Sequence, residues 1–361
     1  MTLNPLCRKL IDVALVVFVS FLAFSCRPAE QASSSGSAPT PVGASIQING
    51  AGATFPYPLY SKWFSEYGKL HPNVRINYQS IGSGGGIKQL SAQTVFFGAT
   101  DGPMTDDQLK AAPGPILHFP TVLGGVVPIY NIPGLTAELK FPAAALAGIY
   151  LGTITKWNDP ALRASNPGVN LPALDITVVH RSDGSGTSYI FCDFLSKVSA
   201  QFKQKVGVAT SVKWPAGVGG KGNEGVAGLV RQSPGAIGYV ELIYALQNTI
   251  SYGAVQNASG EFVKASPESV TAAAGSAVVN MPPDFRVSIT NAQGSGVYPI
   301  SSFTWLLLYE NPSDKERGRI MVDVLKWGLT GGQKFAPELG YAPLPKQLVD
   351  QEQAALQKIR L

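Results

Sequence analysis

Three short segments rich in Gly, Ser and Thr have the composition of an anion-binding site. They read GAGATF at residues 50–55, GSGGG at 82–86 and RSDGSGT at 181–187. Glycine permits positive φ angles and a close approach of the backbone to a ligand. Hydroxyl groups and the free N–H groups of a helix start donate hydrogen bonds, and the helix dipole favours negative charge there. The three segments therefore predict a site for a small anion.

The repetition of this pattern favours one shared site over isolated turns. A single Gly-Ser turn before a helix is usually only a helix cap. Here the pattern occurs in three places, and the third copy contains Arg181. An arginine carries a planar fork of donors that matches the oxygens of an oxyanion.

The sequence gives less support to catalysis or to a metal. The segment GGKGN at 219–223 lacks the hydroxyl residue that follows the lysine in a phosphate-binding P-loop. Ser185 lies in DGSGT and not in the G-x-S-x-G pattern of a nucleophile elbow. The spacing of His and Cys residues fits no metal site. We therefore expect a binding protein with no catalytic residue, no metal and no cofactor. The histidines are His71, His118 and His180.

Strand-like and helical patterns alternate from Ser45 onwards, which predicts an α/β fold with largely parallel strands. Each of the three segments follows a predicted strand and opens a helix, so all three should lie at the carboxyl ends of strands. The predicted strands are 45–49, 74–79, 96–99, 122–130, 176–180, 236–239 and 302–309, and the predicted helices lie at 60–70, 87–92, 315–327 and 347–359.

Eight stretches resemble the phosphate-binding proteins of bacterial phosphate ABC importers. In chain order they are GAGATFPYPLYSKW, YQSIGSGGGIKQL, FGATDGPM, FPTVLGGVVPIYNIPG, IYLGTITKWNDP, VVHRSDGSGTSYIF, VKWPAGVGGKGNEGVAG and PGAIGYVE. The resemblance runs from about Ile48 to the end of the chain. It implies an α/β, two-domain periplasmic-binding-protein fold of type II, which holds inorganic phosphate in the interdomain cleft and delivers it to permease subunits.

The resemblance also implies individual roles. Asp183 would pair with Arg181 and limit its charge. His180, Phe96 and Cys192 depart from the family pattern, and His180 could tune affinity with pH. The implied phosphate ligands are Thr54 and Phe55 in the first segment, Ser83 in the second, Asp101 after the third strand, and Arg181, Ser185, Gly186 and Thr187 in the third segment.

Asp101 would set the specificity of such a site. Phosphate keeps a proton at neutral pH and can donate a hydrogen bond to a carboxylate, whereas sulfate cannot. The alternative role for Asp101 is to cap the helix that follows it. The alternative functions are binding of another oxyanion such as sulfate or molybdate, and a phosphate-sensing or phosphate-ester hydrolase variant of the same fold.

The N-terminus predicts export. Arg8 and Lys9 precede an apolar run that ends in Ala-Phe-Ser before Cys26, which resembles the lipidation site of bacterial lipoproteins. We expect a signal peptide at 1–25, lipidation of Cys26, and a flexible Ser/Pro/Ala linker at 26–44. An ordinary secretory signal or an uncleaved anchor is the alternative. All three place the chain outside the cytoplasm, in the periplasm or at the cell surface.

Length, charge and cysteine content limit the remaining possibilities. The 361 residues suggest two domains, which we place at 45–124 with 300–361, and at 125–299. The net charge of +5 is not gathered into a basic run, so we expect no nucleic-acid partner. Cys192 would be alone in the mature chain and is expected to fill the core. We expect a monomer, since no long apolar heptad pattern occurs.

Overall fold

The computed structural model describes residues 45–361. The predicted signal peptide at 1–25, the predicted linker at 26–44 and the predicted lipidation of Cys26 therefore lie outside the described residues. Within residues 45–361, no helix combines the length and the apolar character that crossing a membrane requires.

Eight strands form the main sheet of the described chain: β1 (Ile46–Gly52), β2 (Val74–Ser80), β3 (Phe97–Thr100), β4 (Ile116–Tyr130), β6 (Thr177–Arg181), β7 (Val218–Gly220), β8 (Ala236–Glu241) and β11 (Ser301–Tyr309). Their order across the sheet is β2-β1-β3-β11-β4-β8-β6-β7. The pairs at the two ends of this order are parallel, as the sequence predicted. The central strands β11 and β4 are antiparallel to each other and to their outer neighbours.

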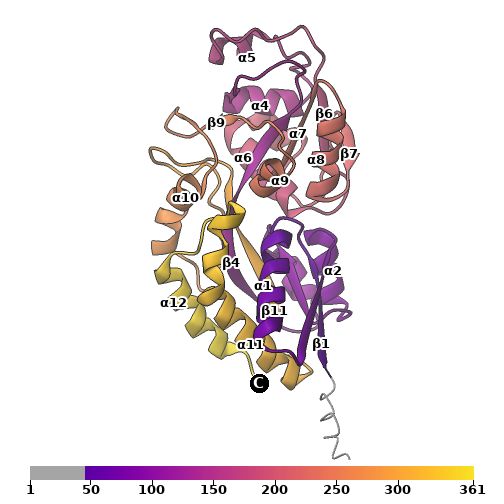
Figure 1. The fold of residues 1–361 in the computed structure, drawn as a ribbon, viewed down its shortest axis with the longest axis vertical. Helices are drawn as coiled ribbons and strands as arrows, with labels where there is room; N and C mark the ends of the chain where they lie inside the picture. Colours follow the sequence, from indigo (N-terminus) through magenta and orange to yellow (C-terminus); the bar gives the residue numbers. More distant parts are fainter. Residues whose placement is uncertain (1–44) are drawn as a thin grey trace, which may run out of the picture. The chain divides into compact units, whose positions relative to one another are not determined.

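The long strand β4 connects two halves of the structure (Figure 1). It pairs with β11 from Ile116 to Gly125, and then with β8 from Val126 to Tyr130. We call the elements around β1, β2, β3 and β11 the first lobe, and those around β6, β7 and β8 the second lobe. The chain leaves the first lobe along β4 and returns along β11 in the opposite direction, which explains the antiparallel centre of the sheet.

Helices accompany each lobe (Figure 1). Those of the first lobe are α1 (Tyr57–Leu70), α2 (Ser83–Ser91), α3 (Asp106–Ala111), α11 (Lys315–Leu329) and α12 (Lys346–Ala355), with the 3-10 turns η1 (Gly331–Phe335), η2 (Pro337–Leu339) and η3 (Leu356–Lys358). Those of the second lobe are α4 (Ala143–Tyr150), α5 (Pro160–Ser165), α6 (Gly186–Val198), α7 (Ala200–Lys205), α8 (Gly222–Gln232) and α9 (Leu242–Gln247). Helix α10 (Pro267–Val279) contacts both β4 and β11. A small sheet contains β10 (Phe262–Val263), β9 (Ala254–Gln256) and β5 (Lys140–Phe141) in that order.

Aromatic packing holds α1, which the sequence predicted at 60–70, to the first lobe. Tyr60, Trp63, Phe64 and Tyr67 are buried on one face. The Trp63 indole also donates a hydrogen bond to the carbonyl of residue 332, at 2.8 Å. Full burial of a large apolar side chain contributes about 1.5–3 kcal/mol. This face fixes the position of residues 53–56, which lead from β1 directly into the helix.

Several element boundaries differ from the predicted ones. Strand β1 runs on to Gly52, because Gly50 and Gly52 pair with both β2 and β3. The Phe97 ring covers Gly50 so closely that an added Cβ would overlap the ring. Helix α2 starts at Ser83, ahead of the predicted 87–92, since the glycines of the second segment are themselves helical. The predicted terminal helix at 347–359 ends at Ala355 and continues as η3.

Candidate binding site between the lobes

The structure brings the three predicted segments together at the junction of the two lobes. The backbone N–H of Gly84 donates to the carbonyl of Gly184 at 2.9 Å, which joins the second segment to the third. A Cβ on Gly186 would overlap both the Ser83 hydroxyl and the Asp101 carboxylate. The third segment therefore requires glycine at this position. The predicted side chains Thr54, Ser83, Asp101, Arg181, Ser185 and Thr187 are all buried.

Three tyrosines hold the first segment. Tyr78 donates to the Ala53 carbonyl at 2.7 Å, Tyr244 to Thr54 at 2.5 Å and Tyr341 to Phe55 at 2.6 Å. Burial raises the pKa of each of these tyrosines well above its ordinary value, so their hydroxyls remain donors. Within one peptide plane, the C=O and the following N–H point in opposite directions. The carbonyls of Ala53 and Thr54 point toward the tyrosines, so the N–H groups of Thr54 and Phe55 point away from the tyrosines.

The Asp101 carboxylate is buried among donors. Thr304 of β11 donates to Oδ1 at 2.7 Å, and the Ser83 hydroxyl lies 3.5 Å from Oδ2. Burial raises the pKa of Asp101 to about 7, against the opposing effects of Thr304, Arg181 and Ser83. The helix that follows is capped by Thr105, whose side chain accepts from Gln108, so the alternative role of Asp101 as a helix cap is wrong.

Arg181 forms a two-point ion pair with Asp183. Its Nε donates to Oδ1 at 2.7 Å and its Nη2 to Oδ2 at 2.5 Å. The N–H of Gly222 also donates to Asp183, at 3.0 Å. Burial acts to raise the pKa of Asp183, but Arg181 and these hydrogen bonds hold it below its ordinary value. The pair leaves Nη1 of Arg181 directed toward Thr187, 3.4 Å from its hydroxyl.

The start of α6 completes the donor set. Ser185 is the N-cap and its side chain accepts from the N–H of Ser188 at 3.0 Å. In any helix the first N–H groups have no intrahelical acceptor. Here they include those of Gly186 and Thr187, and Gly186 lies beside Ser83 and Asp101 of the first lobe. The dipole of a 13-residue helix adds positive potential at this end.

Asn223 is a central residue that the sequence analysis missed. It is fully buried at the start of α8 and donates to both Thr54 and Thr187. Its segment, GGKGN at 219–223, runs from the end of β7 into the start of α8, so it repeats the strand, glycine and helix pattern of the three predicted segments. That pattern is the sequence signal that points to Asn223, and the missing hydroxyl residue after Lys221 excludes only a P-loop. Thr304 and the three tyrosines were also missed.

The histidines and Cys192, which the sequence analysis also named, lie in different environments. Among residues 45–361, no hydrogen bond joins a histidine to Ser185. Burial lowers the pKa of His118 to about 3, and its ring accepts from the N–H of Met104. His180 stacks on Trp214 with ring centroids 5.3 Å apart. Cys192 is fully buried, and burial raises the pKa of its thiol, in accordance with the predicted core position.

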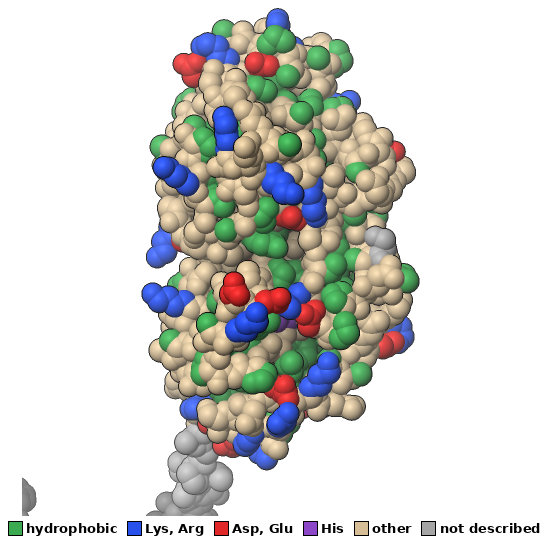
Figure 2. All heavy atoms as spheres, turned by 180° about the vertical axis from the view of Figure 1, so that it is seen from behind, with side chains coloured by type: hydrophobic (Ala, Val, Ile, Leu, Met, Phe, Trp, Pro, Cys, Tyr) green, Lys and Arg blue, Asp and Glu red, His purple; other side chains and the backbone are tan. Residues whose placement is uncertain are grey.

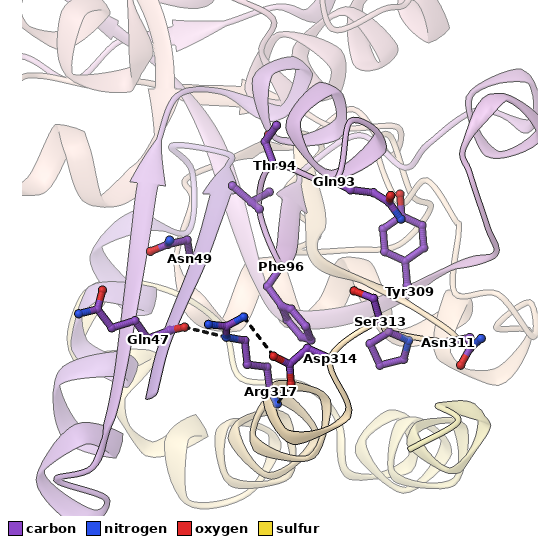
Figure 3. A pocket seen from close by; sticks show the side chains of 12 residues that line it. Gln47, Asn49, Gln93, Thr94, Phe96, Tyr309, Asn311, Ser313, Asp314 and Arg317 are labelled. Carbon is purple, nitrogen blue, oxygen red and sulfur yellow. Dashed lines mark hydrogen bonds and ion pairs between the residues drawn. The ribbon is translucent and has the colours of Figure 1, made fainter. Parts of the chain in front are cut away.

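A separate polar pocket of about 290 Å³ opens on the first lobe (Figure 3). Gln47, Phe96, Tyr309 and Arg317 are among the residues that line it. Arg317 donates to the Gln47 carbonyl at 3.0 Å and pairs with Asp314 at 3.1 Å. None of the predicted ligand residues lines this pocket. On the face that Figure 2 draws, basic and acidic side chains are interspersed.

Comparison with known proteins places this architecture in a family. A model described as the PBP superfamily domain matches residues 30–327. The phosphate-binding protein PstS of Xylella fastidiosa is 48% identical over 340 residues, which cover 91% of this chain and 92% of the relative. PstS of Pasteurella multocida is 46% identical, over 85% of this chain and 89% of the relative.

Solved structures agree on the fold. A high-affinity periplasmic phosphate-binding protein, solved with phosphate bound at pH 8.5, superimposes with a TM-score of 0.69. The match covers 86% of this chain and 93% of that one at 22% identity, so it bears on the fold alone. With the eight-stranded sheet and the long strand shared by two lobes, the fold is the two-domain periplasmic-binding-protein architecture that the sequence predicted. The chain belongs to the PBP superfamily and, within it, to the family of phosphate-binding proteins named PstS.

Proposed function

We propose that this protein binds inorganic phosphate between its two lobes and delivers it to the permease subunits of an ABC importer. The observation that carries the proposal is a buried set of donors, contributed by both lobes, that surrounds the Asp101 carboxylate. The named PstS relatives support the same ligand. The proposed ligands are the groups predicted from the sequence: Thr54, Phe55, Ser83, Asp101, Arg181, Ser185, Gly186 and Thr187.

The charge balance of the site suits a binding protein that must release its ligand. Arg181 supplies the buried positive charge, and Asp183 offsets it through two hydrogen bonds. Most of the attraction for the anion then comes from neutral donors: hydroxyls, N–H groups and a helix start. Such a site holds an oxyanion without a large excess of positive charge.

Asp101 would select for a ligand that carries a proton. Its ionised carboxylate accepts the hydrogen bond of a protonated phosphate and repels the oxygens of a fully ionised sulfate. Sites built around one ligand hydrogen bond reject the analogue that lacks it by about 10⁴–10⁵-fold. A binding protein for sulfate or molybdate, the nearest rival, would have no use for this buried acceptor.

A hydrolase variant of the fold has less support. Ser185 caps α6, and no hydrogen bond within residues 45–361 pairs it with a general base. Hydrolysis would need such a base, a metal or an activated nucleophile. We therefore propose binding without catalysis, with no cofactor. A phosphate sensor on the same fold remains the alternative, and the partners that bind the closed protein would distinguish it.

Binding would be coupled to closure of the lobes. Thr54, Ser83 and Asp101 lie on the first lobe, while Arg181 and Thr187 lie on the second, so a bound anion links the two. We place the first domain at 45–124 with 300–361 and the second at 125–299. The change of partner of β4 at Gly125 and Val126 supports the first of these limits.

The same proposal includes location and assembly. Importer-associated binding proteins act outside the cytoplasmic membrane, so we propose an extracytoplasmic chain. Its signal would be residues 1–25, with a lipid anchor on Cys26 and a linker at 26–44. We propose a monomer that contacts the permease and no nucleic acid. Mass spectrometry of the membrane-extracted protein, which would detect a diacylglyceryl Cys26, tests the anchor.

Calorimetric titration of the purified, phosphate-stripped protein tests the function. We expect tight one-to-one binding of phosphate and no heat with sulfate. Titrations with molybdate and with a phosphate monoester test the oxyanion and hydrolase rivals. Sulfate or molybdate binding as tight as phosphate binding would contradict the proposal, and so would the absence of any phosphate heat.

A further inference from the structure

One buried amide contacts a hydroxyl on each lobe. Asn223 lies at the start of α8 and is fully buried. Its Nδ2 donates to the Thr54 hydroxyl at 2.7 Å and to the Thr187 hydroxyl at 3.1 Å. Thr54 belongs to the first lobe and Thr187 to the second, so this single side chain bridges the two lobes.

The orientation of the amide is fixed by the backbone. The N–H of Glu241 lies 3.0 Å from Oδ1 of Asn223. A backbone N–H can only donate, so the oxygen of the amide must face it. The NH₂ group is thereby directed at the two threonines, and the amide cannot turn over without placing two donors against each other.

This arrangement determines which way both hydroxyls donate. A hydroxyl has two lone pairs and one proton. The oxygen of Thr54 accepts from Nδ2 and, at 3.3 Å, from the backbone N–H of Asn223. The oxygen of Thr187 accepts from the same Nδ2 and, at 3.4 Å, from Nη1 of Arg181. Both lone pairs of each threonine are then in use, and each proton remains to be donated. Within residues 45–361, neither proton has a protein acceptor.

We infer that Asn223 is a positioning residue that directs the protons of Thr54 and Thr187 at the bound anion. The inference rests on the proposed function, in which both threonines are phosphate ligands. A hydroxyl free to rotate can present either a proton or a lone pair, and the second repels an anion. By occupying the lone pairs in the closed arrangement of the lobes, Asn223 makes both hydroxyls obligate donors to the enclosed anion, which orders the donors of the site. It also links the lobes in the closed state.

Two substitutions separate this role from simple packing. N223A removes the donor and should weaken phosphate binding about 10–100-fold. N223D keeps the shape but supplies an acceptor, so it should turn the two protons away from the anion. At pH 8 we expect a loss of at least about 10³-fold. The carboxyl group introduced by N223D regains one donor when it is protonated, so the ratio of the N223D and wild-type Kd values should fall as the pH is lowered to 5. The corresponding ratio for N223A should not change with pH.

Asn166 provides a matched control. It is also buried, but its side chain bonds to Lys140 and Leu162 of the second lobe. N166A should lower the unfolding temperature and leave the phosphate Kd unchanged.

The experiment is calorimetric titration with inorganic phosphate between pH 5 and 8, with thermal unfolding of each phosphate-free variant as a folding check. If N223D does not fold, a double-mutant cycle replaces it, in which the phosphate Kd is measured for N223A, for T187V and for the variant with both substitutions. A positioning role predicts that N223A weakens phosphate binding by a much smaller factor in the T187V background than in the wild-type background.

The outcomes are distinguishable. A wild-type protein that does not bind phosphate would overturn the proposed function and this inference with it. Tight wild-type binding with an unchanged Kd in N223A would overturn the inference alone. The inference would also be overturned if the ratio of the N223D and wild-type Kd values did not depend on pH, or if the effects of N223A and T187V on phosphate binding were fully additive.

Discussion

At the scale of single residues, the proposed selectivity for phosphate depends most on the position of Asp101. The carboxylate is buried, and its pKa is raised to about 7, chiefly by that burial. It therefore changes protonation state in the same pH range in which phosphate exchanges its own proton. On the proposed function, ionised Asp101 would accept a hydrogen bond and disfavour sulfate, while protonated Asp101 would donate a hydrogen bond and would not disfavour it.

We predict that sulfate rejection depends on Asp101 and on pH. In D101N, which cannot become a carboxylate, sulfate binding should strengthen by at least about 10²-fold. In the wild-type protein, the ratio of the sulfate and phosphate Kd values should fall as the pH is lowered from 8 to 5.5. Competition titrations across this range measure both effects. Unchanged sulfate rejection in D101N would refute the acceptor role.

At the scale of elements, α6 connects the site to a second contact between the lobes. Its residues Gly186, Tyr189, Asp193 and Lys197 recur at helical spacing and share one face. Gly186 lies against Ser83 and Asp101, and the Tyr189 ring lies against Gly102. This face of the helix therefore packs on the first lobe at the end where the anion would bind.

The far end of the same face holds the segment that follows α10. Lys197 donates to the hydroxyls of Ser288 and Thr290 at 2.7 and 2.8 Å, and Asp193 accepts from both. Nearby, this segment is bound to the first lobe. Trp305 donates to the carbonyl of residue 285 at 2.8 Å. Although residues 280–299 fall within the proposed second domain, this segment therefore contacts both α6 and the first lobe, and it stabilises the arrangement of the lobes seen here.

We predict that weakening this contact lowers phosphate affinity from a distance. K197M should raise the phosphate Kd about 3–10-fold, mainly through faster release, because the closed state loses charge-assisted hydrogen bonds. Stopped-flow release measurements check this result. The control is K156M, which removes the exposed ion pair between Lys156 and Asp175 and should change neither the phosphate Kd nor the release rate. Equal release rates for all three proteins would mean that the segment moves together with α6.

At the scale of the whole molecule, buried carboxyl groups oppose stability at neutral pH. Burial raises the pKa of Asp101, Glu241 and Glu352. A carboxyl with a raised folded-state pKa contributes stability below its unfolded pKa, and that contribution is lost as the pH rises toward the folded value. These carboxyl groups should therefore lower the stability of the phosphate-free protein at pH 8 relative to pH 5, whereas His118, whose pKa burial lowers to about 3, contributes in the opposite direction. Phosphate binding would offset this loss.

Glu352 allows a test that does not involve the site. It is fully buried on α12, and neither of its carboxyl oxygens has a hydrogen-bond partner among the described residues. We predict that E352Q raises the free energy of unfolding at pH 8 by about 1–3 kcal/mol and changes it little at pH 5. Denaturant titration at the two pH values measures this. E338Q changes an exposed glutamate of the same lobe and is the control. A stabilisation that is equal at both pH values would argue against titration of Glu352.

Much of this protein can be predicted from local patterns in its sequence. Glycine, hydroxyl residues and Arg181 at the ends of strand-like runs indicate anion-binding loops, because backbone freedom and donor chemistry are properties of the residues themselves. The helical spacing of Tyr60, Trp63 and Tyr67 predicts α1 for the same reason. Even the cap of α3 could have been read, since Thr105 and Gln108 form a capping box.

Only the tertiary structure decides which distant groups complete the site. Asn223 lies 169 residues from Thr54, Thr304 lies 203 from Asp101, and Tyr341 lies 286 from Phe55. No local pattern specifies such a contact, because it depends on strand order, on the register of β11 and on the approach of the two lobes. The same approach decides that the amide of Asn223 meets both hydroxyls. The residue types in the sequence thus indicate an anion, and the packing of two lobes determines which atoms face it.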